Sequence, residues 1–260
     1  MTRKDDYYNR AKQQGYRARS AYKLQQLDET ADLFQSGDTV VDLGAAPGGW
    51  LQVAAEAVGA QGKVVGVDLQ RIDDLEPHQV STIPGDMTEA ETRDRLRREL
   101  GDEDDERSVD VVISDMAPNM TGEYDLDHAR SVHLARIAFD TAEEFLEPGG
   151  DFVTKVFQGR DLDDLRADLE ASFQYVRTVT PDASRDASSE VYLVGKGYTT
   201  APVAAGETLT VEIVDTGDEG DGIAKIEEYT IFVAGADVGE QIEVSITDVK
   251  PTFAFAERVD

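Results

Sequence analysis

Val40-Val41-Asp42-Leu43-Gly44-Ala45-Ala46-Pro47-Gly48-Gly49-Trp50 is the stretch that decides the fold. An apolar strand here runs directly into a glycine-rich turn, and residues 51–58 are expected to form the helix that follows. Glycine lets a chain turn tightly and approach a ligand without a Cβ clash. The stretch therefore predicts a strand–turn–helix unit that borders a ligand site of nucleotide size.

The same turn excludes two common nucleotide sites. It has neither the G-x-G-x-x-G spacing of dinucleotide-binding enzymes nor the G-K-[ST] ending of a phosphate-binding loop. A nicotinamide cofactor and a nucleoside triphosphate are therefore not indicated, and S-adenosylmethionine fits the turn better. A glycine-rich turn alone is weak evidence, so this interpretation depends on the rest of the chain.

Acidic residues stand at the ends of three further predicted strands. These strands are expected at residues 63–68, 80–83 and 110–114. The first ends in Asp68, close to the roughly 20-residue offset beyond Gly44 at which such folds place a carboxylate on ribose hydroxyls. Asp86 and Asp115 follow the other two. Each acid alone would also fit a helix cap, but ligands of open α/β sheets bind outside the carboxyl ends of the strands. We therefore expect Asp68 at a ribose and Asp86 at an adenine amino group.

A lysine stands inside a further predicted strand. Helices are indicated at residues 88–100 and 126–146, and Pro148-Gly149-Gly150 is expected to end the second helix. The strand at residues 151–157 follows and holds Lys155 among apolar neighbours. A lysine at a sheet edge extends its amine into solvent, whereas a buried parallel strand has little room for one. Lys155 is therefore a candidate functional residue.

Five motifs together match a known family. They are residues 19–24 (RSAYKL), 42–50 (DLGAAPGGW), 114–119 (SDMAPN), 155–159 (KVFQG) and 188–192 (SSEVY). On these motifs the chain resembles the FtsJ/RrmJ family of ribosomal RNA ribose 2′-O-methyltransferases, in the archaeal form that carries an added TRAM domain. The resemblance implies an α/β fold, namely a Rossmann-like class I S-adenosylmethionine-dependent methyltransferase, followed by a small C-terminal OB-like β-barrel.

The resemblance also implies the site residues. The catalytic tetrad of the family falls on Lys23, Asp115, Lys155 and Glu190. Its cofactor-binding positions fall on Gly48, Trp50, Asp68, Asp86 and Asp115. The implied cofactor is S-adenosylmethionine. The implied substrate is a uridine of 23S rRNA in the large ribosomal subunit.

The chemistry explains why such a tetrad is needed. Methyl transfer from a sulfonium is an in-line displacement, so the enzyme has to align a ribose 2′-hydroxyl and remove its proton as the bond forms. Lys155 is the predicted general base, which requires a neutral amine. Lys23 and the sulfonium favour that neutral form, whereas Asp115 and Glu190 favour the charged form. In a second interpretation Lys155 stays charged and steers the hydroxyl oxygen, Lys23 contacts the target phosphate or ribose, and Glu190 holds the lysines.

The charge of the chain is unusual for a protein that binds RNA. Its 54 acidic and 25 basic side chains give a formal net charge of −29, whereas a basic surface is the usual sign of nucleic-acid binding. Residues 1–24 are the exception, because they hold seven basic and two acidic side chains. We expect Arg17, Arg19 and Lys23 of this arm to bind RNA, with its tyrosines stacking on bases. The alternative is a solvated tail.

The excess of acid elsewhere is interpreted as a solvated surface adapted to a salt-rich, halophilic cytoplasm. Molar salt screens charges beyond about 3 Å, which mutes the repulsion among the acids. The same salt weakens phosphate contacts. RNA binding should then depend on shape, stacking and hydrogen bonds more than on counterion release.

The domain order follows from a change of pattern near residue 200. We expect an N-terminal RNA-binding arm or helix at residues 1–30, a methyltransferase domain at 31–198, a linker at 199–206 and a TRAM-like barrel at 207–260. Short alternating runs predict the barrel strands at residues 209–214, 223–226, 229–233, 241–249 and 252–257. Residues 206–260 carry 14 acidic side chains against three basic ones. This domain should therefore help to dock the substrate without strong phosphate contacts.

Several classes of protein are excluded or disfavoured. The chain has no cysteine and hence no disulfide or cysteine-type zinc site. Its three histidines lack paired ligand spacing, so no metal is predicted. No apolar run approaches the roughly 18 residues of a membrane span, and Met1 opens onto charged residues without a signal peptide. These features predict a cytoplasmic protein without a membrane partner, and a monomer is the default.

Two alternatives to rRNA methylation remain at this point. The first keeps the enzyme and changes its substrate to transfer RNA. The second is a ribosome-assembly or RNA-binding factor that has the fold without the chemistry. The intact tetrad argues against the second, since a protein without catalysis has no physical need for Lys155 inside a strand.

Overall fold

The computed structural model describes residues 3–76, 78–101, 107–184, 188–217, 220–227 and 229–259, with the backbone alone for residues 3–5. The chain forms two compact units, Met1–Lys196 and Gly197–Asp260. Each unit is described by itself.

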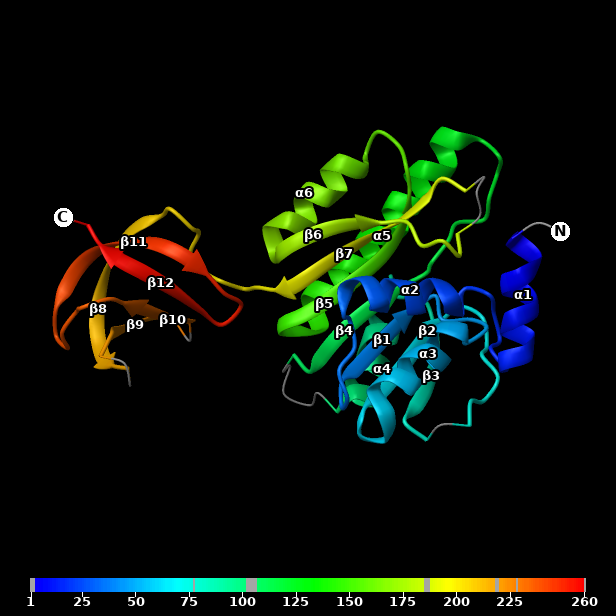
Figure 1. Ribbon diagram of the computed structural model, residues 1–260, viewed down its shortest axis with the longest axis horizontal. Helices are drawn as coiled ribbons and strands as arrows, with labels where there is room; N and C mark the ends of the chain where they lie inside the picture. Colours follow the sequence, from blue (N-terminus) through cyan, green and yellow to red (C-terminus); the bar gives the residue numbers. More distant parts are fainter. Residues whose placement is uncertain are drawn as a thin grey trace. The chain divides into compact units, whose positions relative to one another are not determined.

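The first unit is built on a sheet in which the strands run in the order β3-β2-β1-β4-β5-β7-β6 (Figure 1). The strands are β1 (Thr39–Leu43), β2 (Lys63–Asp68), β3 (Val80–Pro84), β4 (Val109–Ser114), β5 (Leu146–Phe157), β6 (Phe173–Val179) and β7 (Glu190–Tyr198). Strands β1 to β5 pair in parallel, and β7 runs antiparallel to β5. This architecture confirms the predicted Rossmann-like fold.

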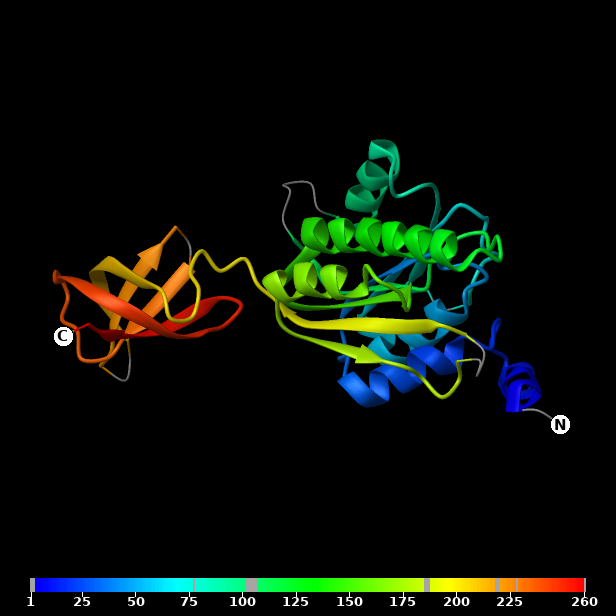
Figure 2. The same ribbon diagram turned by 90° about the horizontal axis from the view of Figure 1, so that it is seen from above.

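Helices cover both faces of this sheet. They are α1 (Arg3–Gln14), α2 (Ala21–Ala31), α3 (Gly49–Val58), the short η1 (Gly59–Gln61), α4 (Ala90–Leu100), α5 (Tyr124–Phe145) and α6 (Leu162–Ser172). Figure 2 shows α2 and α3 on one face and α4, α5 and α6 on the other. The central strands are rich in valine and isoleucine and are buried on both faces, as parallel strands between two helical layers have to be. Among the described residues, no helix has both the length and the apolar character needed to cross a bilayer.

The boundary between α5 and β5 differs from the expectation. The helix ends at Phe145, and β5 begins immediately at Leu146, which pairs with Val109 of β4. The register then shifts before Asp151 pairs with Val111. Residues 148–150 therefore form a bulge inside the strand instead of a turn before it. Early pairing with β4, which no local sequence signal announces, ends the helix.

The second unit is a closed barrel with strand order β10-β12-β11-β8-β9. Its strands are β8 (Thr208–Thr216), β9 (Gly222–Ile226), β10 (Tyr229–Val233), β11 (Gln241–Val249) and β12 (Phe253–Arg258). Alternate side chains such as Val211, Ile213, Val244 and Ile246 point into one apolar core. The predicted OB-like barrel is confirmed.

Candidate active site

The carboxyl ends of β1 to β4 meet around a pocket of about 610 Å³. Asp68, Asp86 and Asp115 line this pocket together with Gly44. The parallel pairing of β3, β2, β1 and β4 brings their loops to one edge of the sheet. Three of the predicted cofactor residues thus share one pocket, outside the carboxyl ends of the strands, where ligands of such sheets bind.

Two of these carboxylates are held by hydrogen bonds from neighbouring residues. Asp68 accepts the backbone N–H groups of Ala46 (2.9 Å) and Gln70 (2.7 Å). Asp86 accepts the backbone N–H (2.9 Å) and the hydroxyl (2.8 Å) of Thr88. The backbone bond, and after it the hydroxyl bond, lowers the pKa of Asp86. Both side chains are thus fixed as acceptors, which suits the hydroxyl and amino donors of a nucleoside.

The glycine turn supports the pocket at close range. Gly44 has a φ of +78°, and a Cβ added to it would lie 2.7 Å from Cγ of Met116. Gly48 has a φ of +105° and precedes α3, while Trp50 is buried and donates its Nε1–H to the carbonyl of Ser20 at 2.8 Å. Within the described residues, the pocket lining includes neither Gly48 nor Trp50. These two predicted positions lie in the supporting structure.

Asp42 lies beneath the turn, in the middle of the sheet. Its side chain is fully buried, and among the described residues neither carboxylate oxygen has a hydrogen-bond partner. Burial raises the pKa of Asp42 well above its ordinary value, and the nearby charges of Asp115 and Asp68 raise it further. A protonated Asp42 is the form that this environment favours.

The four tetrad residues form two ion pairs. Lys155 donates to Asp115 twice, to the backbone carbonyl at 2.6 Å and to Oδ1 at 2.8 Å. Lys23 pairs with Glu190 at 2.5 Å. Tyr192 connects the pairs, because its hydroxyl donates to Oδ1 of Asp115 at 2.8 Å and its ring centroid lies 5.8 Å from Nζ of Lys23. The structure therefore brings the predicted tetrad together.

The register of two antiparallel strands explains this assembly. Lys155 of β5 lies directly opposite Tyr192 of β7, and Phe157 lies opposite Glu190. Residues two apart in a strand share a face, and opposed residues in an antiparallel pair are neighbours. The side chains of Lys155, Phe157, Glu190 and Tyr192 therefore project from one face of the sheet. Asp115 follows the end of the adjacent β4, and Lys23 comes from α2.

The electrostatics of the tetrad are those of a partly buried charge network. Burial by itself would raise the pKa of Glu190, but the charge and hydrogen bond of Lys23, with Ser184 and Lys155, outweigh it and lower the pKa. Burial raises the pKa of Tyr192 well above its ordinary value, and the charges of Asp115 and Glu190 add to the rise. Glu190 is thus held ionised, while Tyr192 stays a neutral donor.

A second pocket, of about 580 Å³, opens on the tetrad. Lys23, Lys155 and Glu190 line it together with Arg19. Ala117 lines both this pocket and the first one, which we call the cofactor pocket after the residues predicted to bind the cofactor. A polyanionic substrate would therefore meet three cationic side chains directly beside the place where the acids of β2, β3 and β4 gather.

The arm residues are placed differently from one another. Arg17 donates its guanidinium N–H groups to the carbonyls of Pro47 (3.3 Å), Asp73 (2.6 Å) and Asp74 (2.6 Å). It thereby ties the glycine turn to the loop after β2. Arg19 lines the tetrad pocket and donates to the carbonyl of Ala183 at 2.8 Å.

The tyrosines of the arm pack mainly on each other. The ring of Tyr22 lies 5.4 Å from that of Tyr7 and 5.9 Å from that of Tyr16, between centroids. Tyr22 is buried, whereas Tyr8 is exposed. Of the four rings predicted to stack on RNA bases, that of Tyr8 is thus exposed, whereas those of Tyr7, Tyr16 and Tyr22 pack on each other.

Sequence reasoning missed two residues of this site and one set of contacts. Tyr192 stands two residues after Glu190 in a strand, and strand alternation could have placed it beside the tetrad. The buried Asp42 could have been suspected from an acid between apolar strand residues. The carbonyl partners of Arg17 carried no sequence signal, since any residue supplies a carbonyl.

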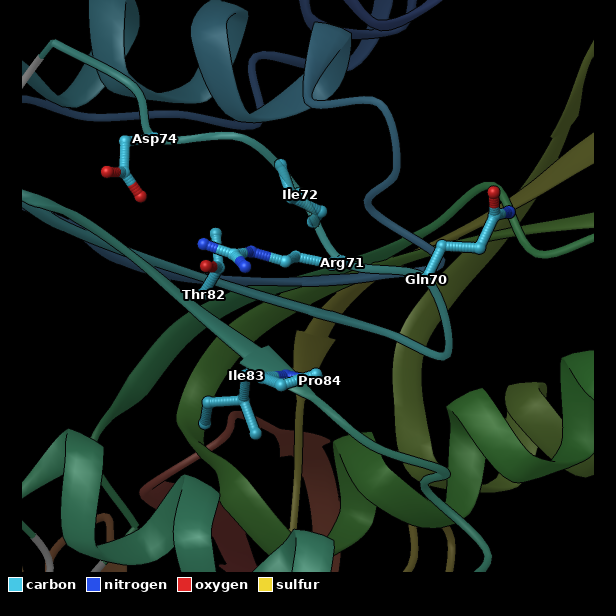
Figure 3. A pocket seen from close by; sticks show the side chains of 7 residues that line it. All are labelled: Gln70, Arg71, Ile72, Asp74, Thr82, Ile83 and Pro84. Atoms are coloured by element: carbon cyan, nitrogen blue, oxygen red, sulfur yellow. The ribbon is translucent and has the colours of Figure 1, made fainter.

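A separate hollow of about 380 Å³ lies beside β3 (Figure 3). The side chain of Arg71 reaches across it toward Thr82, with Ile83 and Pro84 on the other side. It shares Gln70 with the cofactor pocket, and none of the tetrad residues line it. Among the described residues, no three His, Asp or Glu side chains gather as metal ligands would.

Comparison with known proteins agrees with this geometry. Residues 16–198 match the FtsJ-like methyltransferase family, and residues 202–259 match the TRAM domain. The chain is 70% identical over 260 residues to a protein of Halorubrum lacusprofundi named ribosomal RNA large subunit methyltransferase E, covering all of this chain and 95% of that protein. A protein of the same name from Natronomonas pharaonis is 66% identical, with both chains fully covered.

A solved structure is similar over the first unit. A crystal structure from Plasmodium falciparum, described as a ribosomal RNA methyltransferase, is 28% identical and has a TM-score of 0.62. The match covers 70% of this chain and 98% of that one.

Proposed function

Because the chain belongs to the FtsJ-like methyltransferase family, we propose that it transfers a methyl group from S-adenosylmethionine to the 2′-hydroxyl of a uridine in 23S rRNA of the large ribosomal subunit. The observation that carries the proposal is the pair of salt bridges, Lys155 with Asp115 and Lys23 with Glu190, beside the pocket at the carboxyl ends of the strands. The names of the close relatives support rRNA of the large subunit as the substrate.

The residues of the first pocket fit the cofactor. Asp68 and Asp86 are oriented acceptors for the ribose hydroxyls and the adenine amino group. Gly44 keeps the floor free of a Cβ where the β4 loop approaches. When bound, the cofactor supplies an electrophilic methyl group on a sulfonium. Gly48 and Trp50 contribute by holding the turn that shapes the pocket.

The tetrad supplies alignment and charge control for the hydroxyl. Lys155 directs two hydrogen bonds to Asp115, one to its backbone carbonyl and one to Oδ1, which fix the position of the amine. This arrangement supports the interpretation in which Lys155 steers the hydroxyl oxygen, and the proton that the hydroxyl loses as the new C–O bond forms then passes to water in the open tetrad pocket. Lys23 lines the same pocket, where it would contact the phosphate or ribose of the target, and Glu190 fixes its position.

The proposal also covers the RNA contacts, the location and the oligomeric state of the enzyme. Arg19 and Lys23 line the pocket that would receive the RNA, which supports their RNA-binding role. Large ribosomal subunits assemble in the archaeal cytoplasm, so the proposed substrate places the protein there. We propose that it acts as a monomer, and light scattering after size exclusion at molar KCl checks this.

Transfer of labelled methyl groups tests the function. The labelled cofactor would be incubated at molar KCl with unmodified large subunits and, separately, with transfer RNA, using the wild type beside Lys155→Ala. We expect label in subunit ribose, and a loss of roughly a hundredfold or more in the variant. Label only in transfer RNA would show that transfer RNA is the substrate in place of large-subunit rRNA. No label on either RNA, with tight cofactor binding, would favour an assembly factor.

A further inference from the structure

A third pocket adjoins the tetrad pocket. It has a volume of about 150 Å³ and is lined by Met120, Gly122, Tyr124, Asp127, Phe157 and Ser189. Met120, Phe157 and Ser189 also line the tetrad pocket. The tetrad pocket in turn shares Ala117 with the cofactor pocket. The three pockets therefore adjoin one another in a series, with the tetrad pocket in the middle.

Two large side chains with apolar surfaces are exposed in the walls of this third pocket. Met120 is 64% exposed and Tyr124 is 57% exposed, on a surface that is otherwise strongly acidic. A pocket lined by apolar and aromatic side chains with a few polar groups is the usual form of a ligand site. The reactions assigned to the tetrad and to the cofactor pocket use neither side chain.

The pocket is also rigidly built. The hydroxyl of Tyr124 donates to the carbonyl of Gln158 at 2.5 Å, which fixes the ring against the loop after β5. Asp127 is buried and accepts from Thr121 N (2.9 Å), Thr121 Oγ1 (2.8 Å) and Gly122 N (3.0 Å). The loop that carries Met120 is thereby held before any ligand arrives, which lowers the entropic cost of binding.

The opposite wall is anchored by a buried histidine. The carbonyl of Phe157 lies 2.9 Å from Nδ1 of His128, and the backbone N–H of Asp161 donates to its Nε2 at 3.2 Å. A Cβ on Gly159 would lie 2.5 Å from the same imidazole ring. The loop after β5 therefore packs directly on His128, and Phe157 is kept at the boundary of both pockets.

We infer that this pocket binds an unpaired nucleobase of the RNA substrate, next to the ribose that is methylated. The inference rests on the proposed function and names the part of the RNA that the enzyme recognises. A base has two apolar faces, which suit Met120 and Tyr124, and polar edges, which suit the hydroxyl of Ser189. The attached sugar–phosphate would then enter the neighbouring pocket, where Arg19, Lys23 and Lys155 supply positive charge.

The overall charge of the chain strengthens this assignment. A protein with a net charge of −29 gains little from long-range attraction to RNA. High salt weakens phosphate contacts further, whereas stacking of a base on an aromatic ring does not depend on counterion release. An apolar pocket beside the reacting groups thus provides the kind of affinity that such a protein can use.

Substitution of the pocket walls tests the inference. The variants are Tyr124→Ala, Met120→Ala and Tyr124→Phe, which keeps the ring but loses the bond to Gln158. The matched control is Tyr175→Ala, at a tyrosine of β6 that is 48% exposed. The measurements are methyl transfer to unmodified large subunits, with KM for the subunit and kcat separated, and calorimetric affinity for S-adenosylmethionine. We expect KM for the subunit to rise about tenfold in Tyr124→Ala, smaller rises in Met120→Ala and Tyr124→Phe, and wild-type values in Tyr175→Ala.

Three results would overturn the base-binding pocket while the proposed function stands. In the first, Tyr124→Ala keeps the wild-type KM. In the second, Tyr124→Phe shares the full defect, which would assign it to the hydrogen bond with Gln158. In the third, affinity for S-adenosylmethionine falls while KM for the subunit rises, which would indicate a displaced loop. If the wild type transfers no methyl group to the subunit, the proposed function fails, and the base-binding pocket fails with it.

Discussion

Tyr192 joins the two ion pairs of the tetrad although it belongs to neither. Its hydroxyl donates to Asp115, and Lys23 lies over its ring. In Tyr192→Phe the ring remains and the hydrogen bond is lost, so Asp115 is less firmly oriented toward Lys155. We expect kcat to fall about tenfold with KM for the RNA unchanged, and stability to fall by about 1 kcal/mol. A rise in KM without a change in kcat would contradict this positioning role.

Arg17 was predicted to bind RNA, and in the structure its guanidinium donates to backbone carbonyls of two segments that adjoin residues of the cofactor pocket. It connects Pro47 in the glycine turn to Asp73 and Asp74 in the loop after β2. In Arg17→Ala these two segments lose their connection, and we expect affinity for S-adenosylmethionine to fall about tenfold, as the loss of charged hydrogen bonds would cause. Calorimetry measures this directly. Arg19→Ala is the control, because it should raise KM for the RNA without changing cofactor affinity.

Asp42 predicts a dependence of stability on pH. In the unfolded chain its carboxyl ionises near pH 3.9, whereas burial raises its pKa in the folded protein. The folded state therefore holds a proton that the unfolded state releases, and stability falls as pH rises from about 4 toward the folded pKa. In Asp42→Asn this loss is absent. We expect the variant to gain on the wild type by up to about 1.4 kcal/mol per pH unit over that window.

Chemical unfolding at molar KCl, repeated between about pH 4 and pH 8, measures the difference. Asp140→Asn, at an exposed position of α5, is the control and should follow the wild type at every pH. Parallel curves for Asp42→Asn and the wild type would show that Asp42 is ionised in the fold.

At the scale of elements, the turn between β1 and α3 depends on one glycine for two separate reasons. Gly44 has a positive φ, and an added Cβ would also press on Met116 in the loop after β4. Gly37 has a φ of +102° with open space around its Cβ position, so Gly37→Ala tests backbone strain alone. We expect Gly37→Ala to lose roughly 1 kcal/mol of stability and Gly44→Ala to lose more, because its Cβ also displaces Met116.

Cofactor affinity should separate the two variants. Only Gly44→Ala displaces Met116, which lines the cofactor pocket. We therefore expect weaker binding of S-adenosylmethionine in Gly44→Ala and unchanged binding in Gly37→Ala. Equal affinities would mean that the close approach to Met116 is not needed for binding.

The elements that could be predicted from sequence are those with local signals. Strand β2 was predicted with its observed bounds, and β10 and β11 likewise, because apolar residues bounded by turn residues mark them. Strand β7 brings Glu190 and Tyr192 to Lys155 only through antiparallel pairing with β5. Which strands pair is determined by tertiary structure and has no local sequence signal. Glu190 was therefore identified from the resemblance of its motif and not from periodicity.

At the scale of the whole molecule, the excess of acidic side chains destabilises the folded state. The second unit holds 14 acidic and three basic side chains in residues 206–260, although it closes a small barrel core. Within the described residues, ion pairs such as Lys250 with Asp248 neutralise a few of these acids. The remaining repulsion opposes a compact state unless the solvent screens it.

Dilution of salt should therefore destabilise the protein. The screening length grows from about 3 Å at 1 M to about 10 Å at 0.1 M. Acidic side chains whose repulsion is screened at molar KCl therefore repel each other at low salt. We expect the melting temperature, followed by circular dichroism, to fall steadily over this range. Sucrose is the control, because it favours compact states by exclusion from the surface but does not screen charge. A melting temperature that stays constant, or that sucrose restores as fully as KCl does, would show that screening of the acidic surface is not what stabilises the fold.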